Sequence, residues 1–305
     1  MLIFLLQQNE PPQPDDFEDV DVNEPELTNN EVQIAKYLNE LLSHGIRYYA
    51  TGFLLENTKL SLWYADRCGI VKSRYFDFIL EPHYFLLMVA ALYKASPADL
   101  GFCTLISDMP TDFLSHDGAI LTLPHAQNVY GKSIGEETHF DLNIGDSKLL
   151  DVRYGTVGRG TTIIPVHPSG ETLNPRGKQD FDLVVKLSWQ HTKRDEVGKV
   201  RKIRTTFAEA LNIPFFGREV RSALKYIVDL KCSVSLSLKD VGLPRAFMPG
   251  LSDIAPEDGR YLSVLVMKEY IPLWRIDNPG ELKIIFRHAL TGTLSYILLT
   301  SIACG

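Results

Sequence analysis

Cysteine is scarce in this sequence, and its few copies are far apart. The chain has four, at Cys68, Cys103, Cys232 and Cys304, so no pair has the C-x-x-C spacing of a zinc or redox site. This dispersion predicts reduced thiols of an intracellular protein and no disulfide framework. Basic residues are also in deficit, because 38 acidic side chains outnumber 31 basic ones. The net charge of −7 argues against a surface for nucleic acid or for an anionic membrane, since both require a basic face.

Long uninterrupted apolar runs are missing as well. The chain starts with six apolar residues, but no basic residue precedes them and acidic residues soon follow, so a signal peptide is not expected. We expect residues 1–28 to form a disordered acidic leader. Near the other end, residues 281–305 predict a long helix. Thr, Gly, Ser and Tyr interrupt its apolar run, which favours a helix buried in a larger domain over a membrane tail.

The first half of the chain shows helical and strand patterns in turn. Residues 29–45 predict a helix that starts at Asn30 and ends at Gly45. Its apolar positions recur at helical spacing, at Ile34, Leu38, Leu41 and Leu42. Two or three strands follow, with residues 66–69 as a hairpin turn. Residues 83–96 are apolar on nearly every side and predict a buried helix. Residues 101–147 are expected to be rich in loops.

Residues 148–275 predict a small antiparallel sheet packed on one helix. The expected element order is β–β–β–α–β–β, with the helix inside residues 191–211. This is an α+β arrangement.

Three glycines at Gly155, Gly158 and Gly160 lie between the first two of these strands. Glycine lets backbone N–H groups approach a phosphate closely, because it has no Cβ to clash. A kinase phosphate lid has the pattern G-x-G-x-x-G-x-V, and here Ile163 occupies the third glycine position. The alternative is a β-hairpin with a tight tip, and the glycines alone do not separate the two.

A lysine, Lys186, lies within the apolar run of residues 183–187, which predicts a central strand. Burying an ammonium without a partner is costly, so Lys186 either has a function or lies on the solvent face of the strand. A kinase uses such a lysine to hold phosphates and pairs it with a helix glutamate. Glu196 and Glu209 are the candidate partners. Further on, Glu269 and Tyr270 follow a strand and precede an X-Pro turn, as in a kinase hinge or in an ordinary strand exit.

Several separate stretches resemble the fungal-type protein kinase family. They are QIAKYLNELLSHGIRYYATGFLL, LSLWYADRCGIVKSRYFDF, GRGTTIIPV with DLVVKLSW, DLKCSVSLSL with LPRAFM, and VLVMKEYIPL. Together they cover most of residues 30–275. The most specific are VVKLSW and the W-Y-x-D-R-x-G-x-x-x-S pattern formed by Trp63, Tyr64, Asp66, Arg67, Gly69 and Ser73.

The resemblance implies a protein-kinase-like small lobe, an antiparallel sheet plus one helix, preceded by an α/β extension. It implies a family-specific extension at 29–147, a small lobe and hinge at 148–275, and the start of a helical large lobe at 276–305. By the same resemblance Gly158 and Gly160 belong to the lid and Lys186 is the phosphate lysine. Glu196 falls on the family's R-x-E pattern with Arg194, and Glu269 and Tyr270 fall on the hinge. ATP is the implied ligand, and magnesium only if a large lobe supplies its ligands.

Two motifs of the kinase family are absent from the printed sequence. No H-R-D is present, since Arg287-His288 has the reverse order, and Asp180-Phe181-Asp182 precedes Lys186 and so cannot be the D-F-G motif. We therefore expect a truncated, catalytically incompetent member of an ATP-dependent Ser/Thr kinase family. The alternatives are a nucleotide-binding or scaffolding module without catalysis, and a complete kinase whose coding sequence continues. Either way, the apolar residues of the last helix are expected to be exposed and to offer a surface to a protein partner.

Overall fold

The computed structural model describes much of the chain, in several segments. These are residues 27–43, 46–107, 118–142, 151–152, 158–169, 183–211, 227–248, 250, 259–270, 276 and 278–290. By contacts the chain divides into two compact units, which we call the first and the second unit. The first unit contains residues 1–103, 154–158 and 238–254, and the second contains the rest. Contacts divide the chain after Cys103, and the family-based boundary near residue 147 stays a prediction.

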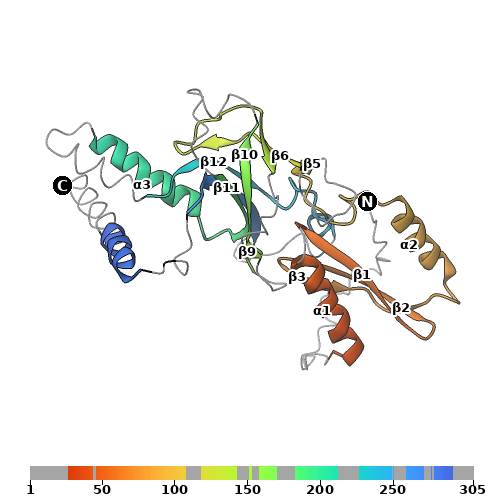
Figure 1. The fold of residues 1–305 in the computed structure, drawn as a ribbon. Helices are drawn as coiled ribbons and strands as arrows, with labels where there is room; N and C mark the ends of the chain where they lie inside the picture. Colours follow the sequence, from red (N-terminus) through yellow and green to blue (C-terminus); the bar gives the residue numbers. More distant parts are fainter. Residues whose placement is uncertain are drawn as a thin grey trace, which may run out of the picture. The chain divides into compact units, whose positions relative to one another are not determined.

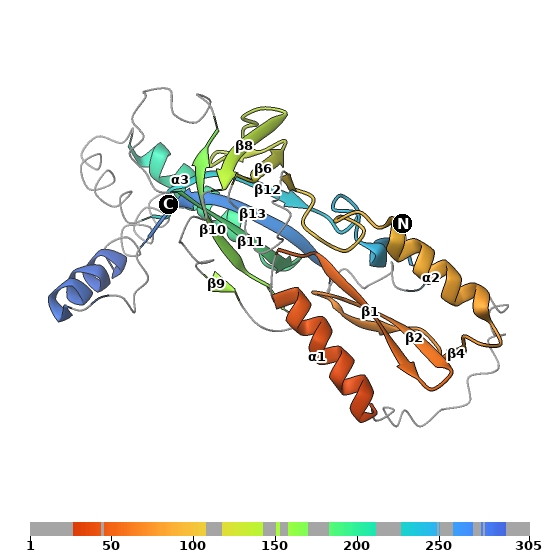
Figure 2. The same cartoon turned by 45° about the vertical axis from the view of Figure 1, so that its right-hand side comes forward.

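The first unit contains a small antiparallel sheet and helices (Figures 1 and 2). Its strands run in the order β1-β2-β3, with β4 paired to β2. The elements are α1 (Asn29–Ser43), β1 (Tyr49–Glu56), β2 (Lys59–Asp66), β3 (Gly69–Lys72), β4 (Phe76–Asp77), α2 (Pro82–Lys94) and a 3₁₀-helix (Pro244–Phe247). The turn predicted at residues 66–69 is confirmed, since Asp66 pairs with Gly69 between β2 and β3.

The second unit contains a nine-stranded antiparallel sheet with the order β5-β6-β8-β10-β11-β13-β12-β7, and β9 pairs with β10. Its strands are β5 (Ile106–Ser107), β6 (Ile120–Pro124), β7 (Gln127–Asn128), β8 (Glu137–Leu142), β9 (Asp151–Val152), β10 (Thr162–Pro168), β11 (Leu183–His191), β12 (Leu230–Leu236) and β13 (Arg260–Lys268). Its helices are α3 (Glu196–Ala210) and a further helix at 279–290. The predicted order β–β–β–α–β–β is confirmed from β9 to β13. The expectation of loops at 101–147 is wrong, because β5 to β8 join this sheet.

Helix α1 forms because its apolar residues share one face and a capping box starts it. Ile34, Leu38 and Leu42 recur four residues apart and pack against β1 and β2. The backbone N–H of Glu31 donates to Thr28 Oγ1 at 3.3 Å, and the Glu31 carboxylate accepts from the Thr28 N–H at 2.9 Å. Thr28, and not the predicted Asn30, is therefore the residue that caps the helix. Leu41, predicted to face the core, is exposed.

Helix α2 lies on the surface, which corrects the expectation of a buried helix. Met88 is its one fully buried residue. Helices α1 and α2 lie against opposite faces of the small sheet (Figure 2). Successive residues of β2 point to opposite faces, so Trp63 joins the α1 core while Leu62 faces α2. Helix α2 is thus held on one side only.

Several expectations concern residues outside the described part of the chain. These are the acidic leader up to Glu26, Gly45, Gly155, and the last helix beyond residue 290. Within the described part, Cys68, Cys103 and Cys232 form no disulfide. No described helix is long and apolar enough to span a membrane.

Candidate functional site

Lys186 lies on the face of the large sheet that α3 covers. It sits on β11, opposite Ile163 of β10 and Leu265 of β13. Directly paired residues point to the same face of a sheet. Leu265 packs against Val197 of α3. The Lys186 side chain therefore faces α3 and is only 21% exposed, so the solvent-face alternative does not hold.

The partner of Lys186 is Glu196, the first residue of α3. Lys186 Nζ lies 2.9 Å from Glu196 Oε2, and Arg159 Nη1 lies 3.2 Å from Oε1 of the same carboxylate. Partial burial raises the pKa of Glu196, but the hydrogen bond from Lys186 and the charges of Lys186 and Arg159 outweigh it. The pKa of Glu196 is therefore held below its usual range. The positive end of the helix dipole also favours a carboxylate at this position.

The other candidate partner, Glu209, lies far from this pair. It is exposed near the end of α3. Thirteen residues of helix separate it from Glu196, which corresponds to roughly 20 Å along the axis. The structure thus pairs Lys186 with Glu196 and not with Glu209.

Two further residues fix the start of α3. Asp195 is its N-cap, and Asp195 Oδ1 accepts from the Gly198 N–H at 2.6 Å. Tyr261 of β13 donates its hydroxyl to the Arg194 carbonyl at 2.8 Å. Burial and the charges of Asp195 and Glu196 raise the pKa of Tyr261. Glu196 is therefore held in place from both the sheet and the helix.

Arg159, between the two predicted lid glycines, is fixed at both its backbone and its side chain. Its carbonyl accepts from the Trp189 N–H of β11 at 2.6 Å, while its guanidinium contacts Glu196. Gly158 and Gly160 have φ angles of +142° and +45°, which glycine adopts far more readily than other residues. Arg159 was not predicted as a site residue, because it fills the variable position of the glycine pattern.

The predicted hinge residues lie apart from the charged pair. They follow β13, and Glu269 is four residues beyond Leu265, which corresponds to about 13 Å along the strand. The Tyr270 hydroxyl accepts from the Asp229 N–H at 2.9 Å and so holds the start of β12. Glu269 is partly exposed. The structure therefore brings Lys186 and Glu196 together but does not bring Glu269 or Tyr270 to them.

The W-Y-x-D-R-x-G pattern forms a second polar cluster, in the first unit. Asp66 is fully buried, and its Oδ2 accepts from Arg245 Nε at 2.6 Å and from the Tyr64 hydroxyl at 2.8 Å. Its Oδ1 accepts from the N–H groups of Cys68 and Gly69. These bonds fix the end of β2 and the turn to β3, and they tie this turn to the 3₁₀-helix. This pattern is therefore structural.

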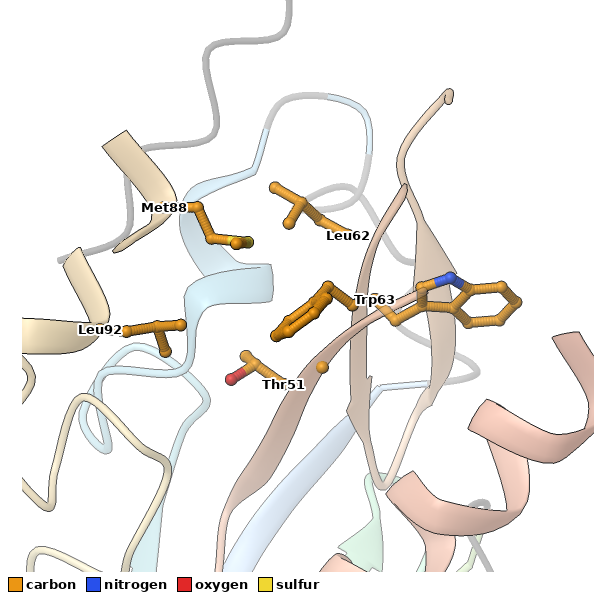
Figure 3. Close-up of a pocket in the computed structure, with 7 residues that line it drawn as sticks. Thr51, Leu62, Trp63, Met88 and Leu92 are labelled. Carbon is orange, nitrogen blue, oxygen red and sulfur yellow. The ribbon is translucent and has the colours of Figure 1, made fainter. Parts of the chain in front are cut away.

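An apolar cavity of about 110 Å³ lies between α2 and the small sheet. In Figure 3, Met88 and Leu92 of α2 point toward Thr51 and Leu62, while the Trp63 ring points away. The cavity belongs to the first unit, whereas Lys186 and Glu196 belong to the second. Among the described residues, no cluster of His, Cys, Asp or Glu could hold a metal ion.

Comparison with known families gives one match. The family model for fungal protein kinases matches residues 6–206, which is more than half of the chain. The match includes Gly158, Gly160, Lys186 and Glu196, and it ends before Glu269 and Tyr270. No curated protein and no solved structure matches. The mixed α/β structure with antiparallel sheets is compatible with a kinase-like fold. The chain belongs to the fungal protein kinase family.

Proposed function

We propose that this chain binds the phosphate groups of ATP at Lys186 and does not by itself transfer the γ-phosphoryl group. The observation that carries the proposal is the ion pair of 2.9 Å between Lys186 and Glu196 on the face of the sheet under α3. In kinases a strand lysine held by a helix glutamate contacts the α- and β-phosphates. Membership of the family supports the same assignment for these two residues.

The charges around Glu196 suit an anionic ligand. Two cations, Lys186 and Arg159, share one carboxylate, which leaves a net positive charge at the start of α3. A partly buried positive charge attracts phosphate more strongly than a fully hydrated one, because the surrounding dielectric is lower. In the proposal, the backbone N–H group of Gly160 covers the phosphates. The Gly158 N–H donates to the Arg67 carbonyl at 3.4 Å instead. Backbone groups at Glu269 and Tyr270 contact the adenine edge.

Catalysis is a separate question from binding. Phosphoryl transfer in kinases requires an aspartate base and metal-binding Asp and Asn residues, from the H-R-D and D-F-G motifs. The printed sequence contains neither motif. We therefore propose that the family's Ser/Thr kinase activity, and its use of magnesium, require groups that these 305 residues do not supply.

Thermal unfolding of the full chain with and without millimolar ATP tests nucleotide binding. A ligand that binds only the folded state raises the melting temperature by mass action. Lys186→Met is expected to abolish the shift. The matched control Lys199→Met removes an exposed lysine from α3 and is expected to keep it. No shift with the unchanged chain contradicts the proposal. Turnover of magnesium-ATP at an ordinary kinase rate, lost in Lys186→Met, contradicts the catalytic half.

The second candidate function is a scaffolding module that binds protein and no nucleotide. The observation that favours it is the helix at 279–290. Five of its apolar side chains are exposed, at Leu282, Ile284, Ile285, Phe286 and Leu290. Exposed apolar side chains in this number on one helix are typical of an interaction site. If ATP does not shift the melting temperature, the scaffolding function is favoured over ATP binding.

A further inference from the structure

The outer face of α2 carries an apolar stripe that nothing in the described chain covers. Leu86, Ala90 and Tyr93 follow one another at spacings of four and three residues, so they share one side of the helix. Leu86 is 64% exposed and Tyr93 is 88% exposed. Ala90 is exposed as well. Between Pro82 and Lys94, the only polar or charged side chains apart from the tyrosine hydroxyls are His83 and Lys94.

The inner face of α2 is already occupied, so the stripe is not the side that holds the helix to its own sheet. Met88 is buried. The rings of Tyr84 and Phe85 pack against those of Phe76 and Phe78, with centroids 5.4 Å and 5.5 Å apart. Met88 and Leu92 point toward the sheet (Figure 3). Leu86, Ala90 and Tyr93 lie on the opposite side of the helix by its periodicity.

The exposed apolar surface is large enough for a stable interface. Leu92 points toward the sheet and is left out; the other exposed apolar side chains of α2 and the turn before it are Ile79, Leu80, Leu86, Leu87, Val89 and Tyr93, each between 44% and 88% exposed. At the usual size of such side chains they expose on the order of 700 Å², close to the roughly 800 Å² that each partner contributes to a standard interface. Isolated exposed apolar residues are ordinary, but a contiguous patch of this size marks an interaction site.

We propose that a second copy of this chain covers the stripe, with the two α2 helices packed antiparallel about a two-fold axis that passes between Leu86 and Ala90, on the outer side of the helix. This arrangement places Leu86 of each copy against Ala90 of the other, a large side chain beside a small one. It places His83 near Tyr93, and Glu81 near Lys94 of the other copy. The antiparallel orientation also places the positive end of each helix dipole beside the negative end of the other. A contact of this kind is isologous and closes as a dimer.

The charge pattern favours a second copy over the chain's own leader. The six apolar residues at the start of the chain would also suit an apolar surface. Residues 1–26 contain eight acidic residues and no Lys or Arg, so they attract Lys94 but repel Glu81, whereas a second α2 offers each of these residues an opposite charge.

Sedimentation velocity of the full chain, from low to high micromolar concentration, tests the proposal. Phe286→Glu, which charges the exposed helix at 279–290, is the reference variant and is expected to form a dimer. Adding Ala90→Glu to it places a charge on the stripe at a position exposed in the single chain, and the double variant is expected to be a monomer with unchanged circular dichroism. A chain that stays monomeric, whether or not residues 1–26 are removed, overturns the proposal, as does a dimer that Ala90→Glu leaves intact.

A charge exchange tests the orientation of the helices. Glu81→Lys alone brings two cations together across the dimer and is expected to weaken it about two- to fivefold. Adding Lys94→Glu is expected to restore the affinity. Within one chain these positions are roughly 20 Å apart along the helix, so the rescue reports on contact between copies. If the double variant dimerises as weakly as Glu81→Lys does, the antiparallel arrangement is wrong.

Discussion

Glu196 is the residue on which the candidate site depends, because it is the only acid that the structure places against either Lys186 or Arg159 in the described chain. If its carboxylate is lost, two cations are left close together without their shared partner. Its lowered pKa shows that the folded chain favours the charged form. The same shift makes the contribution of Glu196 to stability depend on pH.

Glu196→Gln is therefore expected to destabilise the chain at neutral pH by about 1 kcal/mol, the usual size for a partly exposed ion pair. Because the folded pKa lies below the ordinary carboxyl value, the contribution is fully present above that value. It is lost as pH falls through the lowered folded pKa. Urea unfolding of the unchanged chain and of Glu196→Gln, at neutral and at acidic pH, measures the difference in stability. Glu209→Gln is the control, and a Glu196→Gln difference that does not shrink in acid contradicts the expectation.

The buried pair of Asp66 and Arg245 is the second test at the scale of single residues. Both side chains are almost fully buried, and Arg245 Nε donates to Asp66 Oδ2 at 2.6 Å. Removing one partner leaves an uncompensated buried charge, so Arg245→Met is expected to cost about 3–5 kcal/mol. Adding Asp66→Asn removes that charge and should recover part of the loss. Denaturant unfolding measures both. As a control, Arg74→Met replaces an exposed arginine and is expected to change the free energy of unfolding by less than about 0.5 kcal/mol. If Arg245→Met destabilises the chain no more than this control does, the buried pair has no structural role.

Among the elements, α3 shows how a cap can reverse an ordinary propensity. Replacing a helical glycine by alanine usually stabilises by about 1 kcal/mol. A Cβ on Gly198 would lie 1.8 Å from Asp195 Oδ2, so the cap has to break to admit it. Gly198→Ala is therefore expected to give no gain or a loss. In an Asp195→Ala background the same change should stabilise. Thermal unfolding of the four proteins measures the cycle, and equal effects of Gly198→Ala in both backgrounds contradict the argument.

Elements with a strong periodic pattern could be predicted from sequence. Helices α1 and α3 and strand β11 all lie where the apolar spacing placed them. Helix α2 was predicted as buried because it is apolar on nearly every side, and sequence alone does not show that one side lacks a partner. The strands between residues 106 and 142 were missed because two of them are two residues long and glycine and proline surround them.

The candidate site was predictable in part for a similar reason. Lys186 and Glu196 stood out because they match the family's pattern, and the structure pairs them. Arg159 was missed since no residue type is specified between the lid glycines. Asp195, as an N-cap acid directly before a helical pattern, and Thr28 with Glu31, as a capping box, carried signals that could have been used.

For the whole molecule, charge and apolar surface together determine how copies of the chain associate. Eight of the 38 acidic residues and none of the basic ones lie in residues 1–26, so the rest of the chain is close to neutral. Weak repulsion between nearly neutral bodies does little to oppose contact between apolar surfaces. The two exposed apolar helices, α2 and residues 279–290, are therefore expected to dominate association.

The helix at 279–290 is expected to cause association beyond a dimer, because it adds a second apolar surface that α2 pairing leaves open. Phe286 is 56% exposed at its centre. Phe286→Glu is expected to abolish species larger than a dimer in sedimentation velocity and to lower the binding of a dye that reports exposed apolar surface. The control Lys283→Glu introduces the same acidic side chain at an exposed position without removing an apolar group, and it changes the net charge by two units where Phe286→Glu changes it by one. If that control lowers association as much as Phe286→Glu does, charge and not apolar contact is the cause, and the helix is not the surface through which copies meet.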